Sequence, residues 1–171
     1  MNNETYDIEF SIINISSLHK KLTDIFNELI DLENPNTIYK LQIDDDFPQE
    51  YYNGFIEYKR TLATYENKID KLRTQILWRL SEGIIHNEQE MCYYIVGLED
   101  NGAFPTNPID FSELEDSKKI IEQCIKQTKI SMDYRYIQIE NYNKNILIIR
   151  MWKSNEYNQI NYNVNWNIGI I

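Results

Sequence analysis

The sequence predicts an α+β domain, a two-layer sandwich in which helices pack on one face of a mixed β-sheet. Apolar and polar residues alternate in several short stretches, as in half-buried strands. In three longer stretches apolar residues recur every three or four positions, as in amphipathic helices. The two kinds of stretch interleave in the approximate order β-α-β-α-β-α-β-β-β. Because no linker or internal repeat interrupts them, we expect residues 1–171 to form a single domain.

The first 54 residues predict a strand, a helix, a second strand and a loop. The first strand is indicated by four alternating apolar residues: Tyr6, Ile8, Phe10 and Ile12. The helix that follows has Ser16 or Ser17 as its expected N-cap and ends at residues 34–35, Asn-Pro. Residues 37–43 predict the second strand, and the proline-containing stretch 44–54 predicts a loop.

The middle of the chain predicts a long helix and a buried strand. One apolar stripe at helical spacing indicates a helix over residues 55–81: Leu62, Tyr65, Ile69, Leu72, Ile76 and Leu80. Gly83 is the expected C-terminal stop of this helix. Residues 91–98 are a nearly continuous apolar run, which predicts a central strand buried on both faces. A turn-rich loop is expected over residues 99–108.

The last third predicts a helix, a hairpin and a final strand. Asp110 and Glu113 form an expected cap of a helix that runs to about Lys129. Residues 133–152 contain two apolar, β-prone stretches around the turn "NYNKN", which is typical of a β-hairpin. Strict alternation between positions 160 and 170 predicts the final strand.

The composition argues for an acidic protein of the cytoplasm. The net charge is −10 and the isoelectric point is about 4.7, which disfavours non-specific binding to a phosphate backbone. Cys92 and Cys124 lie in apolar surroundings and are expected to be buried, reduced thiols. No membrane span and no signal peptide is expected. Abundant Ile, Asn, Lys and Tyr are typical of AT-rich coding DNA, as in giant DNA viruses or some protists.

No motif in the sequence supports enzymatic chemistry. The "NKID" tetrad at residues 67–70 is a guanine-recognition motif in GTPases, but no phosphate-binding P-loop accompanies it. His19 and His86 are isolated, and the acidic run at 44–46 reads as a solvated loop. Neither cysteine has a nearby base along the chain. We therefore expect no enzyme activity, no cofactor, no metal and no GTP binding.

Tryptophans raise the alternative of nucleic-acid or cap binding. A methylated guanine could stack between two of the three residues Trp78, Trp152 and Trp166. Their positions in predicted helix and strand stripes favour core or rim packing instead.

Two blocks of sequence resemble a known family. Residues 75–83, "QILWRLSEG", and residues 93–102, "YYIVGLEDNG", resemble the segment upstream of the GTPase domain in the GTP-binding protein 1 and GTP-binding protein 2 family of translational GTPases. The resemblance covers residues 34–153, and residues 1–33 and 154–171 are added flanking elements. The family's GTPase domain, with its guanine-binding and catalytic residues, has no counterpart here.

The resemblance implies a non-enzymatic binding module that engages a translation-related protein or ribonucleoprotein. The candidate partner-binding residues are polar and lie outside the predicted core: Arg79, Glu82, Gly83, Glu99, Asp100, Asn101 and Gly102. A structural reading stays open, in which residues 99–102 form a tight turn and Arg79 and Glu82 form a pair on the helix surface. Two other functions also stay open: a structural or assembly protein that forms homo-oligomers through residues 160–170, and direct RNA binding.

Overall fold

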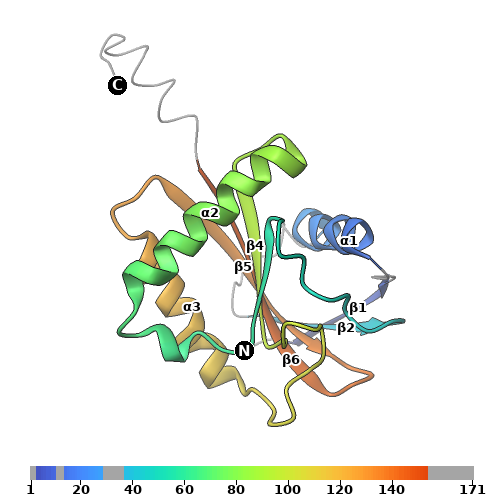
Figure 1. Cartoon of the computed structure of the whole chain (residues 1–171). Coiled ribbons are helices and arrows are strands. Elements are labelled where there is room, and N and C mark those ends of the chain that lie inside the picture. The colour runs from blue at the N-terminus through green and yellow to red at the C-terminus, as the bar shows by residue number, and fades with distance from the viewer. Residues whose placement is uncertain (1–2, 11–13, 29–36, 154–171) are drawn as a thin grey trace.

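A computed structural model describes residues 3–10, 14–28 and 37–153 of the chain, and within them six strands form one mixed sheet (Figure 1). The strands are β1 (Asn3–Phe10), β2 (Ile38–Ile43), β3 (Ile56–Lys59), β4 (Met91–Val96), β5 (Ile130–Ile139) and β6 (Lys144–Lys153). The helices are α1 (Ile15–Glu28), α2 (Ile69–Asn87) and α3 (Phe111–Ile125), with a 3₁₀ turn at Ala63–Tyr65. This architecture confirms the predicted α+β class.

The sheet has the strand order β1-β2-β5-β6-β4-β3. β6 is antiparallel to both of its neighbours, whereas the β1–β2, β2–β5 and β3–β4 pairs are parallel. The predicted hairpin is β5 and β6, and the apolar run at 91–98 contains β4, every residue of which is buried. β1 lies at one edge and extends the sheet next to β2.

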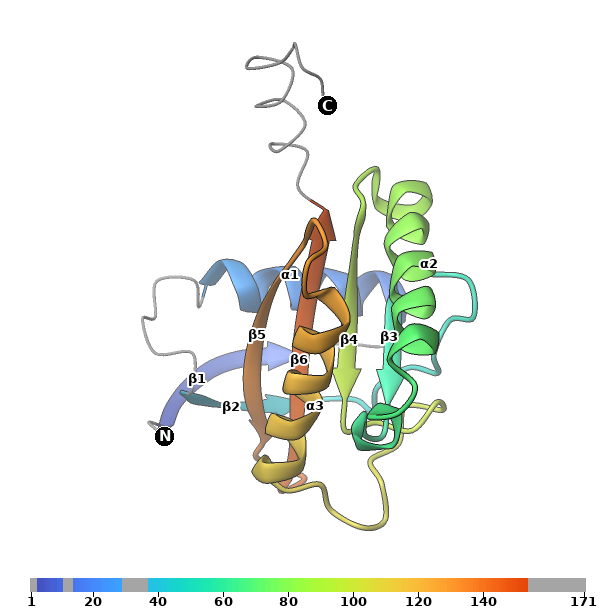
Figure 2. The same ribbon diagram turned by 90° about the vertical axis from the view of Figure 1, so that its left-hand side faces the viewer.

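Helices cover both faces of the sheet rather than the one face expected from the sequence (Figure 2). Tyr93 and Tyr94 are neighbours in β4, so their side chains point to opposite faces. The hydroxyl of Tyr93 lies 3.5 Å from Thr23 Oγ1 of α1, and the hydroxyl of Tyr94 donates to Gln75 Oε1 of α2 at 3.0 Å. A strand that is apolar on both faces needs a layer on each side, and α1 supplies the second one.

The predicted helix over residues 55–81 is wrong in its first half. Residues Ile56–Lys59 form β3, the 3₁₀ turn follows, and α2 begins only at Ile69. β3 pairs with β4 and spans only four residues, so the alternation of Ile56 and Tyr58 with two charged residues is too short to stand out as a strand signal. The "NKID" tetrad therefore straddles the start of α2, with Lys68 as N-cap.

Gly83 is not the end of α2, as the sequence suggested. The helix continues to Asn87, and Glu88 adopts the left-handed conformation at its C-cap with φ 56°. Gly83 is instead the point at which the chain entering β4 crosses the helix. A Cβ atom at this position would lie 2.1 Å from the carbonyl oxygen of Met91, so no larger residue fits without moving the backbone.

Helix caps were predicted with mixed success. Asp110 caps α3 as expected, since its side chain accepts a hydrogen bond from the backbone N–H of Glu113. The cap of α1 is Asn14 rather than a serine: Asn14 Oδ1 accepts from the N–H of Ser17, whose hydroxyl accepts from the N–H of Asn14.

The predicted strand at 160–170 lies outside the described residues. None of the helices in the described segments is long and apolar enough to cross a membrane.

Candidate functional site

Arg79, which we expected outside the core, is buried with 3% of its surface exposed. Its Nε donates to Glu57 Oε1 at 2.7 Å. One terminal nitrogen donates to three backbone carbonyls of the preceding loop, those of Tyr51 at 3.2 Å, Tyr52 at 3.3 Å and Gly54 at 2.5 Å. The fork of guanidinium donors therefore fastens the loop to α2.

Two carboxylates and a lysine complete this buried cluster. Glu50 Oε2 lies 3.7 Å from Arg79 Nη2 and accepts from the backbone N–H of Tyr58 at 2.6 Å. Lys59 Nζ lies 3.5 Å from the other oxygen of Glu57. Burial, together with the nearby Glu57 charge, raises the pKa of Glu50 to about 7. Because Glu57 holds Arg79 at the shorter distance, it is the principal counter-ion of the cluster.

The predicted turn at residues 99–102 supports the same loop from its other side. Gly102 has φ +88° and donates its N–H to the carbonyl of Glu99, which closes a tight turn. The carbonyl of Asp100 accepts from the N–H of Glu50 at 2.8 Å. A Cβ atom on Gly102 would lie 2.2 Å from the carbonyl oxygen of Phe47. Thus the two sequence blocks that carry the family resemblance meet at the loop of residues 47–54.

The candidate partner-binding residues therefore divide into two groups. Arg79, Glu82 and Gly83 are buried, so the expectation that they lie outside the core is wrong. Their polar character misled the prediction because Arg79 is compensated internally, and Glu82 lies 3.6 Å from His86 Nε2 one turn along α2. Asp100 and Asn101 are exposed, Glu99 is half-buried and Gly102 is buried.

An exposed apolar surface lies beside the fastened loop. We define the aromatic surface as the large apolar side chains that α2 and this loop expose to solvent: Tyr51, Tyr52, Leu77, Trp78, Ile84 and Ile85. Tyr52 is 84% exposed and its ring centroid lies 6.0 Å from that of Trp78, which in turn packs 4.7 Å from the Arg79 guanidinium. The four α2 members recur at a spacing of seven residues and so share the outer side of the helix. This surface could not be found from the sequence, in which the position of Trp78 favours core or rim packing.

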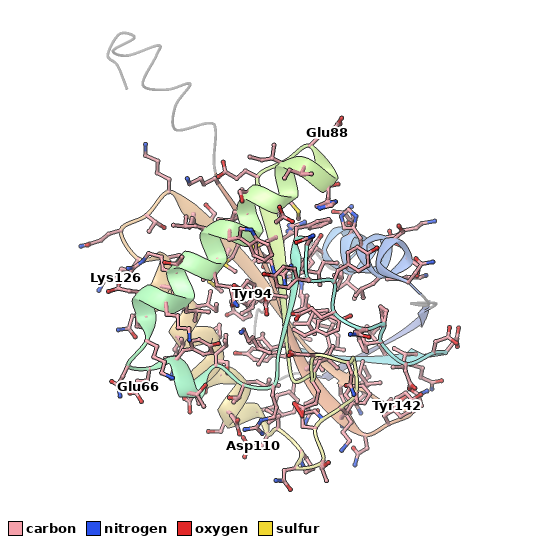
Figure 3. All side chains as sticks on the ribbon, in the orientation of Figure 1. Glu66, Glu88, Tyr94, Asp110, Lys126 and Tyr142 are labelled. Atoms are coloured by element: carbon pink, nitrogen blue, oxygen red, sulfur yellow. The ribbon has the colours of Figure 1, made fainter. Side chains whose placement is uncertain are left out.

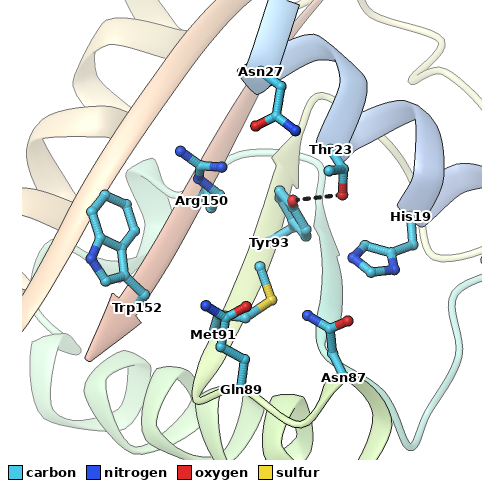
Figure 4. A pocket seen from close by; sticks show the side chains of 9 residues that line it. All are labelled: His19, Thr23, Asn27, Asn87, Gln89, Met91, Tyr93, Arg150 and Trp152. Atoms are coloured by element: carbon cyan, nitrogen blue, oxygen red, sulfur yellow. Dashed lines mark hydrogen bonds between the residues drawn. The ribbon is translucent and has the colours of Figure 1, made fainter. Parts of the chain in front are cut away.

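A separate cavity of about 500 Å³ lies on the α1 face of the sheet (Figure 4). Its walls come from α1, from the end of α2, and from β4 and β6: His19, Thr23, Asn27, Asn87, Gln89, Met91, Tyr93, Arg150 and Trp152. Burial lowers the pKa of His19, so its imidazole is neutral at physiological pH. Burial raises the pKa of Tyr93, although the nearby Arg150 charge opposes this, and the phenol keeps its proton.

Two of the tryptophans lie on opposite faces of the sheet. Trp78 of α2 contacts Tyr52 in the aromatic surface, whereas Trp152 lines the cavity on the α1 face. These two residues therefore do not form a stacking clamp around one base. Trp166 lies outside the described residues.

The described residues offer no metal centre and no activated thiol. No group of three or more His, Cys, Asp or Glu side chains that could hold a metal ion is found among them. Cys92 and Cys124 are both free and buried, as predicted. Burial raises the pKa of both thiols, that of Cys124 to about 11, so neither is a thiolate at neutral pH.

Comparison with known proteins gives one viral relative and no family. No family model matches the chain. Over 70 residues the chain is 40% identical to R625, an uncharacterized protein of Acanthamoeba polyphaga mimivirus. The match covers 39% of this chain and 36% of that protein, so the chain spans about a third of the relative's length. A relative in a giant virus agrees with the origin that the composition suggested.

Proposed function

We propose that this chain is a non-enzymatic binding module that engages a protein of the translation apparatus through the aromatic surface. The single observation that carries the proposal is that Arg79 holds the carbonyls of Tyr51 and Tyr52, next to an exposed Trp78. Tyrosine and tryptophan dominate the energetics of protein interfaces. The translation partner is suggested by the two family-like sequence blocks, which contact this same loop.

The buried Arg79 cluster is better suited to presenting a surface than to stabilising the fold. An apolar replacement of a buried ion pair is often neutral or stabilising, so such a pair needs another reason to be present. Here the guanidinium uses three of its contacts on loop carbonyls. A loop that is held in place before binding loses less conformational entropy when its aromatic side chains meet a partner.

Sedimentation in a translating cell extract, with and without nuclease, tests the proposal. We expect wild-type protein to migrate with ribosomes or with another complex of the translation apparatus. Exchange of both Tyr52 and Trp78 for alanine should abolish this migration. The matched control is Tyr142→Ala, because Tyr142 is 40% exposed and Trp78 38%, and Figure 3 places Tyr142 far from the C-cap residue Glu88 of α2.

Two outcomes would contradict the proposal. Wild-type protein that sediments only at its own size would remove the translation partner. Equal loss of co-migration in the double variant and in Tyr142→Ala would show that the aromatic surface is not the binding site. Sedimentation at the size of an oligomer that the double variant breaks would favour the assembly function instead, with a second copy of the chain on this surface.

A further inference from the structure

The cavity on the α1 face has a lining whose charge is opposite to that of the whole protein. The chain carries 27 acidic residues and a net charge of −10. Among the described residues, the lining nevertheless contains no carboxylate and one permanent cation, Arg150. A cavity that has a positive charge and no carboxylate in its lining attracts an anionic ligand, even where the protein as a whole is acidic.

Arg150 has a donor that its described protein neighbours leave unused. Its Nε is buried without a hydrogen-bond partner in the described part of the chain. One terminal nitrogen lies 3.9 Å from Asp133, and that carboxylate has a closer partner in Arg135 at 2.6 Å. The guanidinium carbon lies over the rings of Phe26 and Trp152, 4.6 Å and 5.4 Å from their centroids. The group is therefore held in place by ring contacts, by the Asp133 carboxylate and by a hydrogen bond with the Tyr93 side chain, while part of its hydrogen-bonding capacity stays open.

Neutral polar groups complete the lining. Figure 4 shows Asn87 and Gln89 on the side of the cavity opposite Asn27, with Arg150 and Trp152 at one end and His19 at the other. Three side-chain amides offer paired donors and acceptors, the pattern that reads the edge of a nucleobase. A volume of about 500 Å³ falls in the range of small-molecule sites.

We propose that this cavity binds a nucleoside monophosphate, with the phosphate on Arg150 and the base against Trp152 and the amides of Asn87 and Gln89. A single guanidinium pairs with one phosphate group through two parallel hydrogen bonds, which suits a monophosphate better than a triphosphate. The indole of Trp152 supplies a face on which a planar base stacks. This inference is independent of the aromatic surface, which lies on α2 and the loop beside it.

Calorimetric titration of the full chain tests the inference. The ligands are AMP, GMP, CMP and UMP, with inorganic phosphate and the four unphosphorylated nucleosides as comparisons. We expect at least one monophosphate to bind with a micromolar dissociation constant, at least tenfold tighter than either phosphate or its own nucleoside. Arg150→Gln should weaken that binding at least tenfold, and Gln89→Ala, at an exposed position on the rim, several-fold.

The control is Arg60→Gln, which removes an exposed arginine outside the cavity and should leave the affinity unchanged. Circular dichroism checks that each variant is folded. If Arg150→Gln does not fold, the affinity of Gln89→Ala is the test of the cavity. The inference is overturned if no monophosphate binds up to millimolar concentration. It is equally overturned if phosphate binds as tightly as the nucleotide, or if the Arg60 and cavity variants behave alike.

Discussion

Replacement of Arg79 by methionine should destabilise the protein far more than replacement of another arginine on the same helix. The side chains of Arg79 and Glu57 are 3% and 6% exposed and join at 2.7 Å. Methionine fills a similar volume but leaves the Glu57 carboxylate buried with Lys59, 3.5 Å away, as its remaining ion-pair partner in the described part of the chain. Removing one partner of such a pair costs about 3–5 kcal/mol. Since domains of this kind are stable by about 5–15 kcal/mol, Arg79→Met should lose a large share of the free energy of unfolding.

Urea unfolding followed by circular dichroism measures this loss. The matched control is Arg73→Met: its ion pair is with Asp70, which is 97% exposed, and its Nε donates to the Cys124 carbonyl at 2.9 Å, so a loss of about 1–2 kcal/mol is expected. Adding Glu57→Gln to Arg79→Met removes the stranded charge and should recover about 2 kcal/mol. A loss below about 1 kcal/mol in Arg79→Met, or no recovery in the double variant, would refute the reasoning.

Three further predictions concern the titration of Glu50, the crossing at Gly83 and the two thiols. Because the folded state raises the pKa of Glu50 from 4.5 to about 7, it binds the proton more tightly than the unfolded chain. The free energy of unfolding should therefore fall as the pH rises from 4.5 to 7.5. Over the same range, urea unfolding should show the stability of Glu50→Gln rising relative to that of wild type by at most about 3 kcal/mol. Equal pH dependence of the two proteins would contradict this. In thermal unfolding, Gly83→Ala should cost more than about 2 kcal/mol because its new Cβ atom would overlap the backbone of the chain entering β4. The control Gly54→Ala should cost less than about 1 kcal/mol, because the nearest atom to its Cβ is a side-chain atom 3.5 Å away. Equal costs would show that the chain does not pass Gly83 closely. Cys92 and Cys124 should react with a chromogenic disulfide within seconds in urea but over hours in the native protein, and a rapid reaction of one equivalent without urea would disprove their burial.

Local patterns predicted the elements that present one apolar face or a clear cap. The stripe of α1, the Asp110 cap of α3 and the β5–β6 hairpin all follow from spacing and turn residues. β3 could not be found in this way, because its alternation of apolar and charged residues extends over only four positions. The helix period of the residues that follow extended the predicted helix back across it.

The errors at Arg79 and Gly83 have a common physical origin. Each residue is explained by a contact with a segment distant in the sequence: Arg79 by Glu57 and the loop carbonyls, and Gly83 by the backbone entering β4. From the sequence alone, a charged residue near the end of a helix indicates an exposed position, and a glycine there indicates the end of the helix. The cavity escaped prediction for the same reason, since α1, α2, β4 and β6 meet there only in the folded chain.

Site-specific photocrosslinking tests the central claim most directly. A photoreactive phenylalanine analogue is placed at position 52 in the aromatic surface or, as control, at position 142, and each protein is irradiated in a translating extract. We expect position 52 to give a defined adduct with one protein of the translation apparatus, identified by mass spectrometry, and position 142 to give none. Identical adducts from both positions, or adducts at position 52 with the chain itself alone, would contradict it.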